Sequence, residues 1–169
     1  MTQRMHCQCC GRPILATRGV IAHHGFERPG YGQTPSCFGA RKPPFEVARD
    51  ALGLYIDALQ NTIAAMRKAR AEVDAEQLPV TLGYTKRAGS SSNMTVRLGL
   101  TRENFEHEVA QHRGSFCLVG PTFDDCKARD LRDRDGRIRM QTEFLAELEA
   151  RYAGWQQTHK RAGGDWVKI

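Results

Sequence analysis

The sequence predicts an α-rich α+β fold, in which a small N-terminal module lies on an antiparallel two-helix scaffold with an inserted β-hairpin. Three observations predict it. Cysteine and proline gather near the N-terminus, two later segments show helical spacing, and two segments between these alternate apolar and polar residues. The 169 residues suffice for one ordinary domain or for a small module with a modest second one. Because the chain has no apolar run of about 18 residues and no apolar signal core, we expect no membrane span and a reducing cytoplasm.

The composition changes near Pro43-Pro44, and this change predicts a domain boundary there. Residues 1–44 contain four of the six cysteines, five of the seven prolines, and six basic residues against one acidic residue, a net charge of +5. Residues 45–169 carry 19 basic and 18 acidic residues. We therefore expect a basic module in 1–44 and a nearly neutral helical scaffold in 45–169.

Two stretches of the scaffold place apolar residues at alternating three- and four-residue steps, which is typical of helices that bury one stripe. The first seam holds Leu52, Ile56, Leu59, Ile63, Met66 and Val73, with Arg70 as its polar member. The second seam holds Ile138, Leu145, Leu148, Tyr152 and Trp155, with Gln141 as its polar member. The two stripes are expected to pack together as an antiparallel helical hairpin, whereas partly exposed seams would favour a homodimer.

A β-hairpin is expected near residues 79–100, because 80–84 and 94–98 alternate apolar and polar residues around a basic loop. A short helix over about 102–112, a strand at 116–119 and a charged helix that opens at Thr122 follow it. The tail from Thr158, with Gly163-Gly164, is expected to fray.

The strongest chemical signal is Cys7-x2-Cys10 followed directly by Gly11, which is the spacing of a zinc knuckle. Two thiolates at this spacing turn toward one ion, and the glycine permits the backbone turn behind them. A second pair of ligands must come from the histidines and the cysteine further along the module. The predicted set is Cys7, Cys10, His24 and Cys37.

Two choices within this set stay open. Cys9 could replace Cys7 or Cys10, because His6-x2-Cys9 overlaps the motif with the same spacing. His23 could replace His24, since neighbouring side chains of an extended segment face opposite ways and only one is expected to bind. Any of these closed four-ligand sets leaves no position for a reactive water, so the zinc would be structural and would supply much of the stability of the module.

Three segments of the module carry a resemblance. They are Cys7-x2-Cys10-Gly11-Arg12-Pro13-Ile14, then GVIAHHGFERPG over residues 19–30, and Ser36-Cys37-Phe38-Gly39-Ala40. Together they resemble the N-terminus of a group of small zinc-finger proteins of bacteriophages and prophages, over about a quarter of the chain. The resemblance implies a zinc-binding phage protein in a bacterial cytoplasm, and it implies no particular activity.

The charge of the module predicts a non-enzymatic protein that binds nucleic acid. Basic side chains stand between Phe26, Tyr31 and Phe38, so phosphate contacts and stacking surfaces occur together. The expected contact residues are Arg12, Arg28, Arg41, Lys42, Lys86 and Arg87.

Two alternatives belong to other classes of protein. One is a phage anti-defence or anti-CRISPR inhibitor that binds a bacterial host protein, which the same basic surface would also suit. The other, less favoured, is a metal-dependent nuclease of the His-Asn-His kind. It would use the histidine that zinc leaves free, but residues 1–44 contain no asparagine to orient that histidine.

Overall fold

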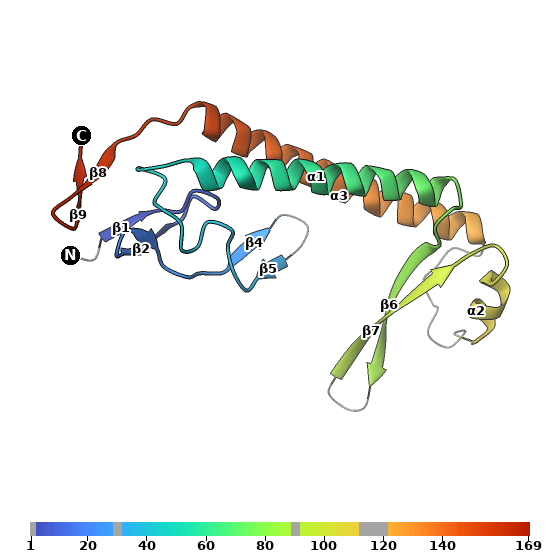
Figure 1. The fold of residues 1–169 in the computed structure, drawn as a ribbon. Coiled ribbons are helices and arrows are strands. Elements are labelled where there is room, and N and C mark those ends of the chain that lie inside the picture. Colours follow the sequence, from blue (N-terminus) through green and yellow to red (C-terminus); the bar gives the residue numbers. More distant parts are fainter. Residues whose placement is uncertain (1–2, 29–31, 89–91, 112–121) are drawn as a thin grey trace. The chain divides into compact units, whose positions relative to one another are not determined.

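The computed structural model describes residues 3–28, 32–88, 92–111 and 122–169. Their contacts divide the chain into two compact units, of which the first joins 1–63 to 139–169 and the second contains 64–138. The described residues form three helices and several antiparallel strand pairs, so the predicted α+β class is confirmed (Figure 1). The predicted boundary near residue 44 lies inside the first unit.

The first unit opens with a three-stranded antiparallel sheet of β1 (Gln3–His6), β2 (Pro13–Thr17) and β3 (Val20–Ile21). Its inner face buries Met5, Ala16 and Ile21, which are at most 3% exposed. Arg18 and Gly19 form the two-residue turn between β2 and β3, and both have positive φ angles, as such tight turns require. A second antiparallel pair follows, β4 (Phe26–Arg28) and β5 (Gly32–Thr34).

The helix seams that the sequence indicates are buried at some positions and half-buried at others. Helix α1 (Asp50–Asp74) buries Leu52, Leu59, Ile63 and Val73, and helix α3 (Phe123–Ala153) buries Leu148 and Gln141. In the first unit the helices run antiparallel, since Arg49 donates to the Tyr152 carbonyl and Gln60 to Glu149. In the second unit Arg70, the polar member of the first seam, pairs with Asp135 at 3.0 Å.

The second unit contains the predicted hairpin, β6 (Val80–Ala88) paired with β7 (Ser92–Leu100), and the short helix α2 (Phe105–Gln111). Its core consists of Val73, Val80, Leu82, Leu100, Phe105, Phe123 and Cys126. Asp130 of α3 accepts a hydrogen bond from the Thr81 amide at 2.8 Å, which attaches the hairpin to the helix. Thr122 and Asp125 form a reciprocal capping box at the start of α3.

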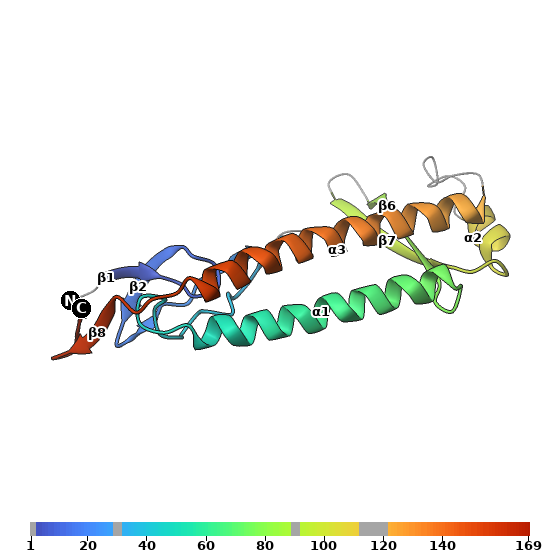
Figure 2. The ribbon, with the colours of Figure 1, turned by 90° about the horizontal axis from the view of Figure 1, so that it is seen from above.

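The C-terminal tail differs from the expectation. Residues from Thr158 do not fray, because β8 (His159–Ala162) and β9 (Asp165–Lys168) pair as a hairpin around Gly163-Gly164. In both views this hairpin lies beside the N-terminal strands of the same unit (Figures 1 and 2). The strand expected at 116–119 lies outside the described residues.

Candidate metal centre

The turn that follows β1 positions the first two thiols. The Gly11 amide donates to the Cys7 carbonyl and the Cys7 amide donates to the Arg12 carbonyl, both at 3.0 Å. Gly11 has a φ of 71°, a left-handed conformation that favours glycine, so the sequence places it where the turn needs it. The Cys7 and Cys10 side chains therefore face the same point.

A second turn brings His24 and Cys37 to that point. The Cys37 amide donates to the His24 carbonyl at 2.8 Å, which joins the two segments directly. His24 Nδ1 lies 2.8 Å from the Ala22 carbonyl, a contact that fixes the proton on Nδ1 and leaves Nε2 as a free acceptor. Behind Cys37, the Ala40 amide donates to the Cys37 carbonyl and closes the turn.

The four donor atoms have the spacing of a tetrahedral site. All of them lie within 4.8 Å of one another. Cys7 Sγ is 3.7 Å from Cys37 Sγ, and Cys10 Sγ is 3.4 Å from His24 Nε2. Bonds of about 2.3 Å to sulfur and about 2.0 Å to nitrogen would set these separations at about 3.8 Å and about 3.5 Å in a zinc tetrahedron. The four side chains are therefore arranged so that they could hold a metal ion.

The electrostatics of the cluster favour a cation. Hydrogen bonds from the Cys37 and Cys7 thiols hold the pKa of Cys10 below its ordinary value. The hydrogen bond with Cys10 is in turn the largest effect that raises the pKa of Cys37 and of Cys7. The Cys10 thiol therefore ionises before Cys7 and Cys37, which keep their protons while they donate to it. A bound divalent cation would replace those protons and balance the charge of the three thiolates.

The structure distinguishes between the alternatives that the sequence left open. Cys9 is 1% exposed, but its Sγ points to the Ala51 carbonyl, 3.7 Å away, and lies outside the group of four. His23 is exposed, and His6 pairs through Nδ1 with Glu46 at 2.6 Å. Among the described residues, Cys7, Cys10, His24 and Cys37 form the one group of three or more donors close enough for a metal ion.

Two side chains that sequence reasoning missed hold the metal loop in place. Gln8 is fully buried, donates to the Pro43 carbonyl at 2.8 Å and accepts from the Leu52 amide at 3.1 Å, so it connects the loop to α1. Arg151, near the end of α3, donates to the Cys7 and Gln8 carbonyls at 2.7 and 2.6 Å. The partners of Arg151 lie more than 140 residues away in sequence, and no local pattern could have indicated them.

The predicted binding residues have different surroundings. Arg41 and Lys42 are exposed directly after the second turn, with Arg41 at a φ of 62°. Arg12 donates to the Gly25 carbonyl and to Cys10, and this second hydrogen bond is the main effect that raises its pKa. Arg12 therefore lies at the metal cluster itself. The structure describes the backbone of Arg28, Lys86 and Arg87 but not their side chains.

Comparison with protein-family models, with curated proteins and with solved structures gives no match for this chain. In the part of the chain that the structure describes, no helix is both long enough and apolar enough to cross a bilayer. What the chain does must therefore be inferred from the cluster and its surroundings. If all four donors bound one metal ion, they would complete its tetrahedron and leave no open position for substrate or water, as in structural zinc sites.

Proposed function

We propose that the protein binds one structural zinc ion through Cys7, Cys10, His24 and Cys37, and binds nucleic acid through the basic surface that this site holds in place. Zinc is the metal that suits the donor set, because soft thiolates with one imidazole in tetrahedral geometry select it over harder cations. The meeting of these four donors within 4.8 Å supports the zinc site, and the exposed ring and basic side chains that follow Cys37 support nucleic-acid binding. The resemblance to phage zinc-finger proteins agrees with a zinc site, and membership of that group stays a prediction.

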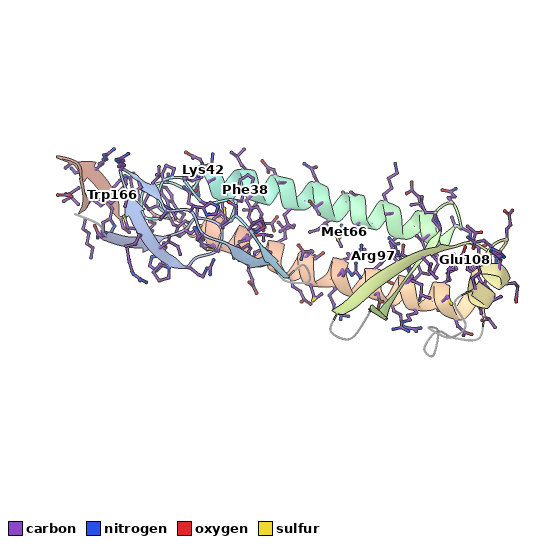
Figure 3. All side chains as sticks on the ribbon, turned by 90° about the horizontal axis from the view of Figure 1, so that it is seen from below. Phe38, Lys42, Met66, Arg97, Glu108 and Trp166 are labelled. Carbon is purple, nitrogen blue, oxygen red and sulfur yellow. The ribbon has the colours of Figure 1, made fainter. Side chains whose placement is uncertain are left out.

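The segment after Cys37 supplies the groups that nucleic acid requires. Phe38 is 43% exposed, and its ring stacks on Tyr55 with the centroids 5.3 Å apart. The two basic side chains of Arg41 and Lys42 follow within four residues, also exposed. Figure 3 shows Phe38 and Lys42 close together near the first turns of α1. A half-exposed ring beside cations offers a stacking surface together with phosphate contacts.

The other aromatic residue of the module that the structure describes has a different role. Phe26 lies 6.0 Å from Phe144 of α3, ring centroid to ring centroid, and is partly buried. It therefore belongs to the packing between the β4–β5 pair and the helix. Phe38 is therefore the aromatic side chain of the proposed binding surface.

The first test measures metal content and binding on the same protein. We expect one zinc per chain, and binding of labelled 20-nucleotide single strands, RNA or DNA, that weakens as salt rises. The variant Arg41→Gln/Lys42→Gln should lower the slope of log K against log salt by about 1.4, since each single-strand phosphate contact contributes about 0.7. The matched control is Arg132→Gln/Arg137→Gln, which removes two exposed arginines of α3 and should leave the slope unchanged.

Two results would overturn the proposal. If the purified chain contains no metal but has its native helix content, the proposed zinc site is wrong. A zinc-loaded chain that binds no single or double strand at low salt, and instead retains a protein partner from a bacterial lysate at high salt, would replace nucleic acid with the host-protein alternative.

A further inference from the structure

The Arg12 guanidinium lies between the two turns that carry the metal ligands. Its Nη2 donates to the carbonyl of Gly25, the residue directly after His24. A second hydrogen bond goes to the Cys10 thiol, which belongs to the first turn. Cys10 Sγ and His24 Nε2 are 3.4 Å apart, so both contacts of Arg12 lie on this side of the cluster. One side chain therefore contacts a ligand sulfur and the backbone next to a second ligand.

The other arginine at the metal loop contacts it differently. Arg151 donates to backbone carbonyls, that of Cys7 at 2.7 Å, and these acceptors are neutral. The charge of Arg12 instead faces thiols. The hydrogen bond with Cys10 is the main effect that raises the pKa of Arg12, and attraction to the thiolates of the three cysteine ligands raises it further. Arg12 is thus bound to the charge of the cluster, whereas Arg151 is bound to its backbone.

A site with three cysteines and one histidine carries a charge that needs a partner. Three thiolates, one neutral imidazole and one Zn²⁺ sum to a charge of −1. The imidazole of His24 is neutral, because its Nδ1 proton goes to the Ala22 carbonyl and Nε2 is an acceptor. Cys7 and Cys37 are buried and Cys10 is partly buried, so water reaches this charge only in part. A buried charge is costly unless an opposite charge pairs with it, and the site therefore favours a cation.

We propose that Arg12 is the counter-ion of the zinc centre, with a charge that offsets the excess negative charge of the three thiolates. This inference rests on the proposed zinc site and deepens it. Arginine suits the position because its planar guanidinium donates to two acceptors at once, here a sulfur and a carbonyl. Arg12 therefore differs from the exposed Arg41 and Lys42, since its charge is balanced within the module and theirs is available to phosphate.

Variants at Arg12 separate the effect of its charge from that of its hydrogen bonds. Arg12→Gln can still donate a hydrogen bond but has no charge, and it should weaken zinc binding by about 10-fold or more, as loss of an outer partner of a metal ligand does. Arg12→Lys keeps the charge but not both hydrogen bonds, and should recover part of that loss. The matched control Arg4→Gln removes an exposed arginine of β1 and should keep wild-type affinity. Competition with a chromogenic chelator measures these affinities.

Alkylation at saturating zinc gives a readout that a purely structural role would not change. A cation beside a thiolate lowers its pKa and with it the nucleophilicity of the sulfur. Because Arg12 contacts Cys10, Arg12→Gln should raise the rate at which iodoacetamide modifies Cys10 several-fold relative to Cys37. Mass spectrometry identifies the modified cysteines. Arg12→Lys should bring the ratio of the two rates back toward the wild-type value.

The outcomes separate this inference from the proposed function. A wild type that binds no zinc overturns both. If the wild type binds zinc and Arg12→Gln matches it in affinity and alkylation pattern, Arg12 is not the counter-ion and the zinc site stands. Equal losses in Arg12→Gln and Arg12→Lys would also overturn the inference, since the charge would then have no effect. If zinc-loaded Arg12→Gln lowers the slope of log K against log salt for single strands by about 0.7, the guanidinium contacts a phosphate and the inference is wrong.

Discussion

Replacing Gly39 with alanine tests the metal centre with a single methyl group. Gly39 is buried against the cluster, and a Cβ there would overlap Cys7 Sγ and lie 3.2 Å from the Cys9 amide nitrogen. Its φ angle is not positive, so the effect of the substitution is steric and not a backbone strain. Restoring an ordinary contact of about 3.5 Å would move the Cys7 sulfur by about 1 Å. Metal–ligand distances tolerate only about 0.2 Å.

The expected loss follows from the cost of overpacking. A methyl group forced into a filled site costs about 1–3 kcal/mol, which corresponds to a fall in zinc affinity of up to about 100-fold. Competition with a chromogenic chelator measures this affinity directly. The matched control is Gly136→Ala in α3, where a Cβ meets nothing within 4 Å and which should gain about 1 kcal/mol of helix stability without changing zinc affinity. If Gly39→Ala binds zinc as tightly as the wild type, Cys7 is not a ligand in this geometry.

Two further changes test the metal centre and the second unit. Cys37→Ser should release zinc and remove the hydrogen-exchange protection of residues 3–28, while helix content stays largely intact. Cys126→Ser, at a buried thiol of the second unit, is the control and should keep one zinc per chain. If Cys37→Ser retains zinc, another residue supplies the fourth ligand. Hydrogen bonds from Arg102 and then Lys127 lower the pKa of Glu76 to about 2 from its ordinary 4.5. The ion pairs of Glu76 therefore stabilise the fold fully above pH 4.5 and progressively less as the pH falls toward 2. Urea unfolding at pH 6 and pH 3 should show a smaller loss of stability for Glu76→Gln than for the wild type, and equal losses would contradict this account.

The parts of the fold that the sequence could predict depend on short-range patterns. The seam of α1 repeats every three or four residues, and alternation in β6 and β7 marks a hairpin within 21 residues. Cys7 and Cys10 lie in one turn, so their meeting needs no knowledge of the rest of the chain. The choice of His24 over His23 needed the three-dimensional structure, because it depends on the contact of His24 Nδ1 with the Ala22 carbonyl.

The parts that the sequence could not predict depend on single long-range contacts. The C-terminal hairpin carries a local turn signal in Gly163-Gly164, but its strands are too short and too polar to predict pairing. The hairpin is held by the Glu46 carbonyl, more than 110 residues away. Because every residue has a backbone carbonyl, the sequence does not indicate which one accepts these hydrogen bonds. Arg151 is similar, since an arginine near a helix end is ordinarily read as a favourable partner of the helix dipole.

The turns of the metal centre also lead directly to the surface proposed for nucleic acid, because Arg41 and Lys42 follow the turn that carries Cys37. Arg151 donates to the carbonyls of Cys7 and Gln8, and its guanidinium lies 4.4 Å from the centre of the Phe45 ring, next to the Glu46 that holds the hairpin. If these turns loosened on loss of the metal, Arg41 and Lys42 would lose their fixed positions, and Arg151 would lose its acceptors. Zinc binding and nucleic-acid binding should then be linked, so that each raises the affinity for the other by the same factor. A zinc titration with and without saturating single strand measures that factor from both sides, and a factor of one would show that Arg41 and Lys42 hold their place without the metal.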